Sequence, residues 1–191
     1  MGRLGSGLLL LCLFGAASAQ NLIQNGHFNG PVGACDTFNI PAGSTLIPGW
    51  TVTVGNVDWY TGPPCGWATR RRAGPNSIDL VGDAAGGIGG IQQSFGTVPG
   101  RSYLVMFDLA GNYGGDPPAV KPLQVKVAGV TKNYMFDTTG KGQFSMGWTH
   151  VKFAFVATSS MTTLEFVSDV SGFGGPDNAG AVIASVGVFA Q

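Results

Sequence analysis

Short runs of alternating apolar and polar residues dominate the chain, and no segment shows the apolar spacing of an amphipathic helix. Gly, Pro, Asn and Asp separate these runs and are typical of turns. Strands are expected over residues 22–28, 50–54, 57–60, 77–81, 91–95, 102–109, 123–127, 134–136, 148–157, 163–167 and 181–189. Gly55-Asn56 is expected to make a hairpin connection, and residues 30–48 a loop. Many short strands at close spacing predict an antiparallel β-sandwich.

Residues 102–109 differ from the other runs because they are apolar on both faces. Leu104 and Met106 occupy one face, and four further apolar residues occupy the other. This pattern predicts a strand inside the sheet that is buried from both sides.

Residues 1–19 have the pattern of a secretory signal peptide. Arg3 is followed by an apolar run over residues 8–14, and Ala17-Ser18-Ala19 matches a cleavage site before Gln20. The apolar run is too short to span a bilayer, and no later segment is long enough. The remaining 172 residues, 20–191, are expected to form one secreted, extracellular domain without a membrane span.

The charge of the chain is low and balanced. Ten basic and ten acidic residues give a formal net charge of zero, and charged residues make up only 10% of the sequence. This composition gives no electrostatic basis for binding nucleic acid or an anionic membrane.

Two cysteines, Cys35 and Cys65, remain after the expected cleavage. An even pair in an exported chain predicts a disulfide, and closing a loop of this length contributes roughly 3–4 kcal/mol. The alternative is two buried free thiols. A zinc site is not expected, because two cysteines and two distant histidines, His27 and His150, do not have the spacing of zinc ligands.

Residues 49–72 concentrate aromatic and basic side chains. Trp59, Tyr60 and Trp67 lie among Gly and Pro residues, which predicts an exposed loop whose aromatic faces contact sugar rings. The alternative is that these rings pack in the protein, as is expected for Trp50 and Trp148. Arg70 begins a run of three arginines that suits sugar hydroxyls or uronate carboxylates, although such a run is also typical of a solvated edge.

A second candidate binding loop contains Asn112, Tyr113 and Asp116 beside two glycines. These polar residues either contact a ligand or simply form a turn. Asp79 and Asp108 lie in apolar strand contexts, so structural hydrogen bonds are expected for both carboxylates.

The sequence contains no standard catalytic motif. The G-x-S-x-G, H-E-x-x-H, P-loop and dinucleotide-binding patterns are all missing. Hydrolysis of a glycoside needs two carboxyl groups across a cleft, and no pair of acidic residues stands out. The chain is therefore not expected to be an enzyme.

Several segments resemble the DUF642 family and its bacterial relatives called choice-of-anchor C proteins. The segments similar to the family are Asn21-Leu22-Ile23-Gln24-Asn25-Gly26-His27-Phe28, Pro48-Gly49-Trp50, Val57-Asp58, Asn76-Ser77-Ile78-Asp79-Leu80, Ile91-Gln92-Gln93-Ser94-Phe95, Ala110-Gly111-Asn112, Pro118-Ala119-Val120-Lys121, Phe136-Asp137-Thr138-Thr139-Gly140-Lys141 and Met146-Gly147-Trp148. They follow the family order over nearly all of residues 20–191.

The resemblance implies an all-β fold, a single antiparallel jelly-roll β-sandwich of the galactose-binding-like type. It also implies an exported protein of the cell wall or matrix that binds a polysaccharide or other glycan. Related jelly rolls often hold a structural calcium through acidic residues after the N-G-x-F motif and in the final strand. His27, Asn29 and Ala184 stand at the corresponding positions here. No cofactor or metal is therefore expected. The alternative is a structural calcium held by backbone carbonyls together with Asn25 or Asp177.

The expected function is non-catalytic carbohydrate binding outside the cell. The alternative is a structural or adhesive extracellular protein that acts through protein contacts. Loop aromatics and polar side chains favour the first, while nothing in the sequence identifies a glycan.

Overall fold

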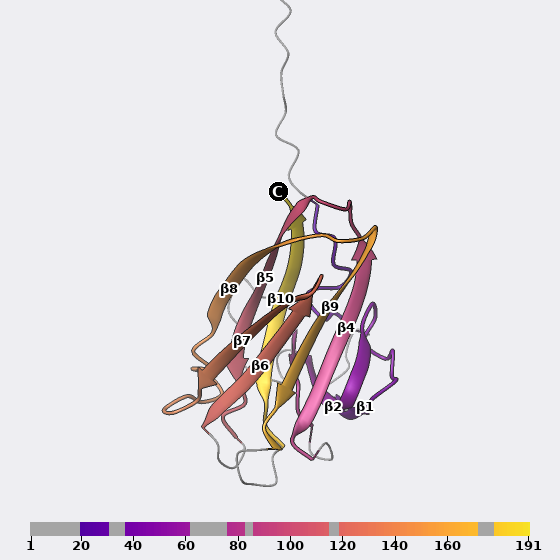
Figure 1. Ribbon diagram of the computed structural model, residues 1–191. Helices are drawn as coiled ribbons and strands as arrows, with labels where there is room; N and C mark the ends of the chain where they lie inside the picture. Colours follow the sequence, from indigo (N-terminus) through magenta and orange to yellow (C-terminus); the bar gives the residue numbers. More distant parts are fainter. Residues whose placement is uncertain (1–19, 31–36, 62–75, 83–85, 115–118, 172–177) are drawn as a thin grey trace, which may run out of the picture.

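The computed structural model describes residues 20–30, 37–61, 76–82, 86–114, 119–171 and 178–191, and these ranges contain ten β-strands (Figure 1). The strands are β1 (Thr37–Pro41), β2 (Thr51–Thr61), β3 (Asn76–Asp79), β4 (Ile88–Gly96), β5 (Ser102–Gly111), β6 (Val120–Val127), β7 (Val130–Asp137), β8 (Thr149–Val156), β9 (Met161–Asp169) and β10 (Ala181–Ala190). No helix long and apolar enough to cross a membrane occurs in the described part of the chain. The expected signal peptide lies outside the described residues.

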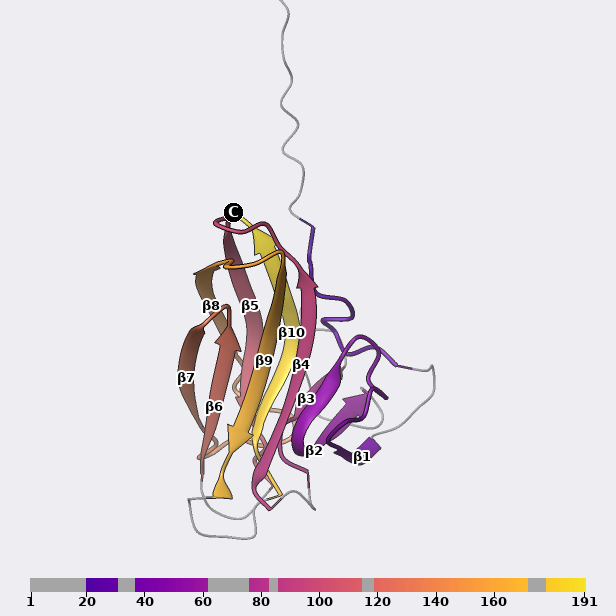
Figure 2. The ribbon, with the colours of Figure 1, turned by 45° about the vertical axis from the view of Figure 1, so that its right-hand side comes forward.

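The strands form two packed layers of antiparallel neighbours (Figure 2). One layer has the order β7-β6-β9-β4, and the other has the order β3-β10-β5-β8. β2 belongs to both layers, because its first half pairs with β4 and its second half with β3, while β1 pairs with β2. The expected antiparallel β-sandwich is confirmed.

The expected hairpin at Gly55-Asn56 is wrong, because β2 runs through both residues as one strand. Gly55 marks the point where β2 leaves β4 and turns toward β3. Its φ of +57° is in the left-handed region, and a β-carbon there would overlap the carbonyl oxygen of Ile88. Only glycine meets both conditions without strain. A glycine that bends a strand was therefore mistaken for a glycine that ends one.

Aromatic rings from both layers fill the centre of the sandwich. Phe107 on β5 meets Phe166 on β9 with ring centroids 5.1 Å apart, and Trp50 lies 6.2 Å from Phe166 and 5.3 Å from Phe28. Trp50 and Trp148 are both buried, as expected. β5 lies between β10 and β8, which confirms its interior position. Its outward-facing Leu104 and Met106 are only half-buried, so the strand is not buried equally on both faces.

The expected first strand, residues 22–28, is a series of turns instead. Asn25 and Phe28 have φ values of +50° and +52°, which a regular strand cannot contain. This segment still makes backbone hydrogen bonds to β10, from Leu22 N to Val188 O (2.9 Å) and from Val186 N to Gly26 O (2.8 Å). The apolar residues that suggested a strand therefore pack at the edge of the sandwich without strand geometry.

The N-terminal segment also reaches the other layer through a pair of glutamines. The Gln93 side chain on β4 accepts from Gln24 N (2.6 Å) and donates to Gln24 O (2.9 Å). β1, in contrast, falls inside the expected loop 30–48 and was missed. Its five residues contain a register shift and Asn39 at a φ of +55°, so no regular alternation marks it in the sequence.

Candidate functional site

Trp59 is a core residue, and its expected place in an exposed loop is wrong. The residue lies on the inner face of β2 and is 2% exposed. Its indole Nε1 donates to the carbonyl oxygen of Phe28 at 2.9 Å. The neighbouring turn residues suggested a loop, but β2 extends to Thr61 and carries Trp59 into the sandwich. The ring therefore anchors the N-terminal segment.

The other expected binding residues are only partly described. Tyr60 is half-buried and packs against the core cluster. Tyr113 is also half-buried beside that cluster. The remaining candidates, Trp67, Arg70, Asp116 and the cysteines Cys35 and Cys65, lie outside the described residues. Their expected roles stay predictions.

Asn112 takes part in a buried hydrogen-bond network around Asp79. Its Nδ2 donates to Asp79 Oδ2 at 2.7 Å, and its Oδ1 accepts from Gly114 N at 2.9 Å. Asp79 Oδ1 accepts from Val81 N (3.0 Å) and from Gly180 N (2.9 Å). The expected structural hydrogen bonds of Asp79 are confirmed, and Asn112 has the turn-forming role that was weighed against ligand contact.

The Asp79 carboxyl is fully enclosed, which has an electrostatic consequence. Burial raises the pKa of Asp79 to about 7. The hydrogen bond from Asn112 and the bonds from the backbone amides favour the ionised form and oppose this rise, whereas the charge of Asp58 adds to it.

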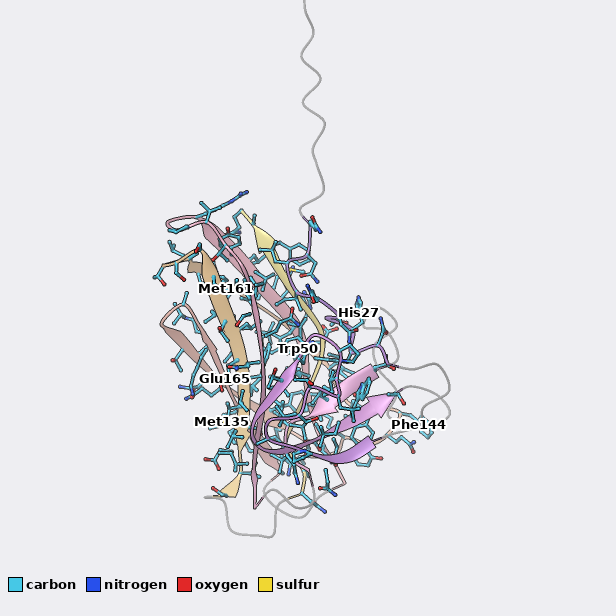
Figure 3. The ribbon with its side chains drawn as sticks, turned by 90° about the vertical axis from the view of Figure 1, so that its right-hand side faces the viewer. His27, Trp50, Met135, Phe144, Met161 and Glu165 are labelled. Atoms are coloured by element: carbon cyan, nitrogen blue, oxygen red, sulfur yellow. The ribbon has the colours of Figure 1, made fainter. Side chains whose placement is uncertain are left out.

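A hollow of about 350 Å³ lies on the outer side of the layer that contains β10, β5 and β8. It brings together the only two histidines of the chain. Its lining residues are Asn21, His27, Met106, Asp108, His150, Ser185, Val186, Gly187 and Phe189. Figure 3 shows His27 on the side of the molecule opposite to Met135, Glu165 and Met161.

A β-bulge in β10 builds one wall of the hollow. Ala184 pairs with Asp108 and Gly187 with Met106, so Ser185 and Val186 together lie opposite a single residue of β5. Ser185 has a φ of +52°, and its hydroxyl lies 3.4 Å from His27 Nδ1. Bulges and left-handed non-glycine residues occur preferentially at functional sites, where they redirect side chains.

Asp108 and His150 form the opposite wall. They pair across β5 and β8, and His150 Nδ1 lies 2.9 Å from Asp108 Oδ1. A carboxylate oxygen accepts, so Nδ1 is the donor, and the Nε2 of a neutral ring is then an acceptor. The Asp108 side chain is 6% exposed and that of His150 is 37% exposed. The buried carboxylate therefore orients a ring that remains partly accessible, and the expected structural hydrogen bond of Asp108 is confirmed.

The arrangement suits binding better than nucleophilic catalysis. Ser185 contacts His27, whereas Asp108 contacts His150, so the groups of a Ser-His-Asp triad are divided between two histidines. Within the described ranges, no group of three or more His, Cys, Asp and Glu side chains is placed to hold a metal ion.

The calcium position of related jelly rolls does not fit a cation in this chain. Asn76 Nδ2 donates to Asn29 Oδ1 (3.1 Å) and lies 3.4 Å from the carbonyl oxygen of His27. Ala184 offers no side-chain oxygen. An amide donor therefore faces the oxygens that would coordinate calcium, and donors and cations exclude each other.

His27 and His150 lie 123 residues apart in the sequence, so no local pattern connects them. The register of β5 against β8 places His150 beside Asp108, and the bulge of β10 places Ser185 beside His27. Neither the register nor the bulge has a sequence signal of its own. The only available hint was that both histidines of the chain flank apolar runs.

The chain belongs to the family described as "Protein of unknown function (DUF642)", whose model matches residues 21–188. The expected family is thereby confirmed. No match was found among curated proteins.

Solved structures that share the fold include the following two. One is the arabinose-bound MgGH51 α-L-arabinofuranosidase, with a TM-score of 0.57 and 16% identity over 89% of this chain. The match covers only 26% of that enzyme's chain. The other is a putative sugar binding protein from Bacteroides thetaiotaomicron, with a TM-score of 0.52 and 14% identity over 90% of this chain and 100% of that one. At these identities the likeness concerns the fold alone.

Proposed function

We propose that this protein is an exported, non-catalytic carbohydrate-binding protein of the cell wall or extracellular matrix, and that the hollow between His27 and His150 holds the glycan. The observation that carries the proposal is the chemistry of this hollow, in which two histidines and a buried carboxylate border an apolar surface.

Sugars present both hydroxyl groups and apolar C–H faces, and the hollow offers partners for each. Met106 and Phe189 supply the apolar surface, while the imidazoles supply polar atoms. Asp108 fixes the tautomer and orientation of His150, which lowers the entropy cost of a hydrogen bond from its accessible edge.

The fold comparisons are compatible with this function. Among the solved structures that share the fold, one is an arabinose-bound enzyme and another is described as a putative sugar binding protein. Export is supported by the signal-like pattern of residues 1–19, and N-terminal sequencing of the secreted chain, expected to begin at Gln20, would test it.

Glycan arrays followed by calorimetry with the strongest ligand would test the site. His27→Ala and His150→Ala are expected to weaken binding about tenfold or more, because each removes a hydrogen-bonding group worth about 1.4 kcal/mol or more. Lys132→Ala on β7 is the control, since this exposed side chain lies on the other layer. Unchanged affinity in both histidine variants would rule out the hollow as the site.

The second candidate function is adhesion through protein contacts, and one exposed aromatic favours it. Phe144 is 87% exposed at the tip of a tight turn closed by the Gly142–Ser145 bridge. The buried Met146 and Trp148 fix the chain just beyond this tip, which lies on the same side as His27 (Figure 3). Exposed aromatics on rigid turns are typical anchors of protein interfaces.

Phe144→Ala separates the two functions. A protein contact centred on Phe144 would be lost in this variant, while glycan affinity at the hollow would remain. Chemical crosslinking of the wild type and of Phe144→Ala, with and without the glycan found on the array, provides the measurement.

A further inference from the structure

A lysine without an ion-pair partner borders the hollow between the two histidines. Lys152 on β8 lies directly opposite Met106 on β5, and Met106 lines the hollow. The β-carbons of directly opposite residues on antiparallel strands are about 5 Å apart, so Lys152 stands at the rim. The residue is exposed and forms no ion pair within the described ranges of the chain. Its ammonium group is therefore accessible to a ligand in the hollow.

The accessible edge of His150 lies on the same face of β8. His150 and Lys152 are two positions apart on one strand, so they project from the same face at a spacing of about 7 Å. Nδ1 of His150 donates to Asp108, which leaves Nε2 for a ligand. In the neutral ring Nε2 accepts a hydrogen bond, whereas in the protonated ring it donates one. Protonation thus makes this edge a charged donor while the bond to Asp108 stays in place.

Positive charge exceeds negative charge at the hollow once His150 is protonated. The charged and titratable side chains there are His27 of the N-terminal segment, Asp108 of β5, and His150 and Lys152 of β8. The Asp108 side chain is 6% exposed and bonded to His150, so its charge opposes that of the ring. β10 contributes only uncharged residues to the lining. On β3, the strand beside β10, Asp79 is fully buried and bonded to Asn112, outside the lining.

We infer that the glycan held in this hollow is anionic, and that a sugar carboxylate or sulfate accepts hydrogen bonds from His150 Nε2 and Lys152 Nζ. This inference rests on the proposed glycan site and specifies its ligand. A carboxylate stays ionised above about pH 4, and histidine gains its charge between about pH 8 and 5. Ligand and site are therefore oppositely charged in mildly acidic solution. Such charge complementarity favours an acidic glycan over a neutral one of the same shape.

Calorimetry of the secreted full-length chain with three tetrasaccharides would test the inference. Tetragalacturonate and its fully methyl-esterified form share a backbone and differ in charge, while a sulfated galactan tetrasaccharide presents sulfate instead. At pH 5 the acid is expected to bind about tenfold or more tightly than the ester, because charge-assisted hydrogen bonds are the stronger ones. Its affinity should fall about tenfold by pH 7.5, whereas that of the ester should not change. Tighter binding of the sulfated sugar than of the acid would support the inference and identify sulfate as the preferred anion.

Matched variants locate the anion on β8. Lys152→Gln removes the charge and is expected to weaken binding of the acid about threefold to fivefold, with the ester unaffected, since an exposed charge pair contributes modestly. Lys132→Gln makes the same change on the exposed strand β7 of the other layer and should alter neither affinity. His150→Gln should remove the pH dependence.

Two outcomes would overturn the inference without touching the proposed function. Equal affinity for acid and ester, with both weakened by His150→Ala, would leave the hollow as the site of a neutral glycan. A preference for the acid that neither Lys152→Gln nor His150→Gln reduces would place the anion elsewhere. Absence of binding to every glycan would instead overturn the proposed function, and this inference with it.

Discussion

Replacing Trp59 with phenylalanine tests whether this ring serves the fold or a ligand. The substitution keeps an aromatic side chain on the inner face of β2 but removes the indole N–H and the second ring. Trp59 Nε1 donates to Phe28 O at 2.9 Å, and both residues are buried, at 2% and 0% exposure. The variant therefore leaves a buried carbonyl without its donor.

The magnitude follows from two contributions. An unsatisfied buried acceptor costs about 1–3 kcal/mol. The lost ring also leaves a cavity. Complete truncation of a buried Trp to Ala costs about 3–5 kcal/mol, and Phe costs less than this because it keeps the larger share of the packing contacts. The neighbourhood cannot close this space easily, because the indole packs directly over Gly30, where any β-carbon would overlap it. We expect a decrease of about 2–4 kcal/mol in the free energy of unfolding.

Urea unfolding followed by far-ultraviolet circular dichroism gives the required measurement, since tryptophan fluorescence would itself change in the variant. Met135→Ala is the control. Its side chain is 64% exposed on β7, so the free energy of unfolding should change by less than about 0.5 kcal/mol. Folded Trp59→Phe should bind the array-selected glycan with wild-type affinity. A variant of wild-type stability that has lost glycan binding would refute this reasoning and restore Trp59 as a ligand contact.

Three further predictions concern stability. Burial raises the pKa of Asp79 from 3.8 to about 7 in the folded chain, so ionisation of this group opposes folding: its contribution to stability is fully present below about pH 4 and is lost as the pH rises toward 7, by an amount on the order of 4 kcal/mol. Asp79→Asn should flatten this dependence in chelator-treated buffer, and parallel pH profiles of the two proteins would contradict the assignment. Gly55→Ala should destabilise by about 3 kcal/mol or more in urea unfolding, because of its left-handed φ and the overlap with Ile88. Gly43 also has a positive φ (+86°), but an added β-carbon there meets no atom within 4 Å, so Gly43→Ala should cost less. Gln93→Ala should cost about 1–3 kcal/mol, because it leaves Gln24 N and O without partners, and unchanged amide exchange at Gln24 would argue against this bridge.

The strands of this protein could be predicted wherever the alternation of residues is regular. β4 to β10 all lie where apolar and polar residues alternate or where an apolar run is flanked by turns. The wrong strand predictions have a common physical cause. Residues with positive φ interrupt the alternation of apolar and polar residues without ending the strand. Asn39 hides β1, and Gly55 divides β2 in the sequence pattern. Asn25 and Phe28 produce the converse error, in which an apolar run without strand geometry resembles a strand.

The motifs that carry the family resemblance prove to be contacts within the fold. Gln24 in the first motif is hydrogen-bonded to the side chain of Gln93 in the Ile91–Phe95 motif. Asp79 likewise accepts a hydrogen bond from Asn112, which lies in a different motif. Asn25 Nδ2 donates to the carbonyl oxygen of Pro48 at 2.9 Å, which joins a further two motifs. These pairs explain why the family order identified the fold correctly and why it gave no binding residue.

One proposed binding residue, His27, lies where this chain departs from the family pattern. His27 stands at a position that is acidic in the related motif, and its ring contacts Ser185 in the β10 bulge. Replacing a carboxylate with an imidazole removes a cation ligand and adds a group that both donates and accepts hydrogen bonds, as sugar hydroxyls require. The same substitution thus removes one possible calcium ligand at the chain ends, in addition to the one missing at Ala184, and adds a polar group to the wall of the hollow. It follows that ligand preference in this family should vary with the residues at positions 27 and 185, while the hydrogen-bonded motif pairs hold the sandwich constant.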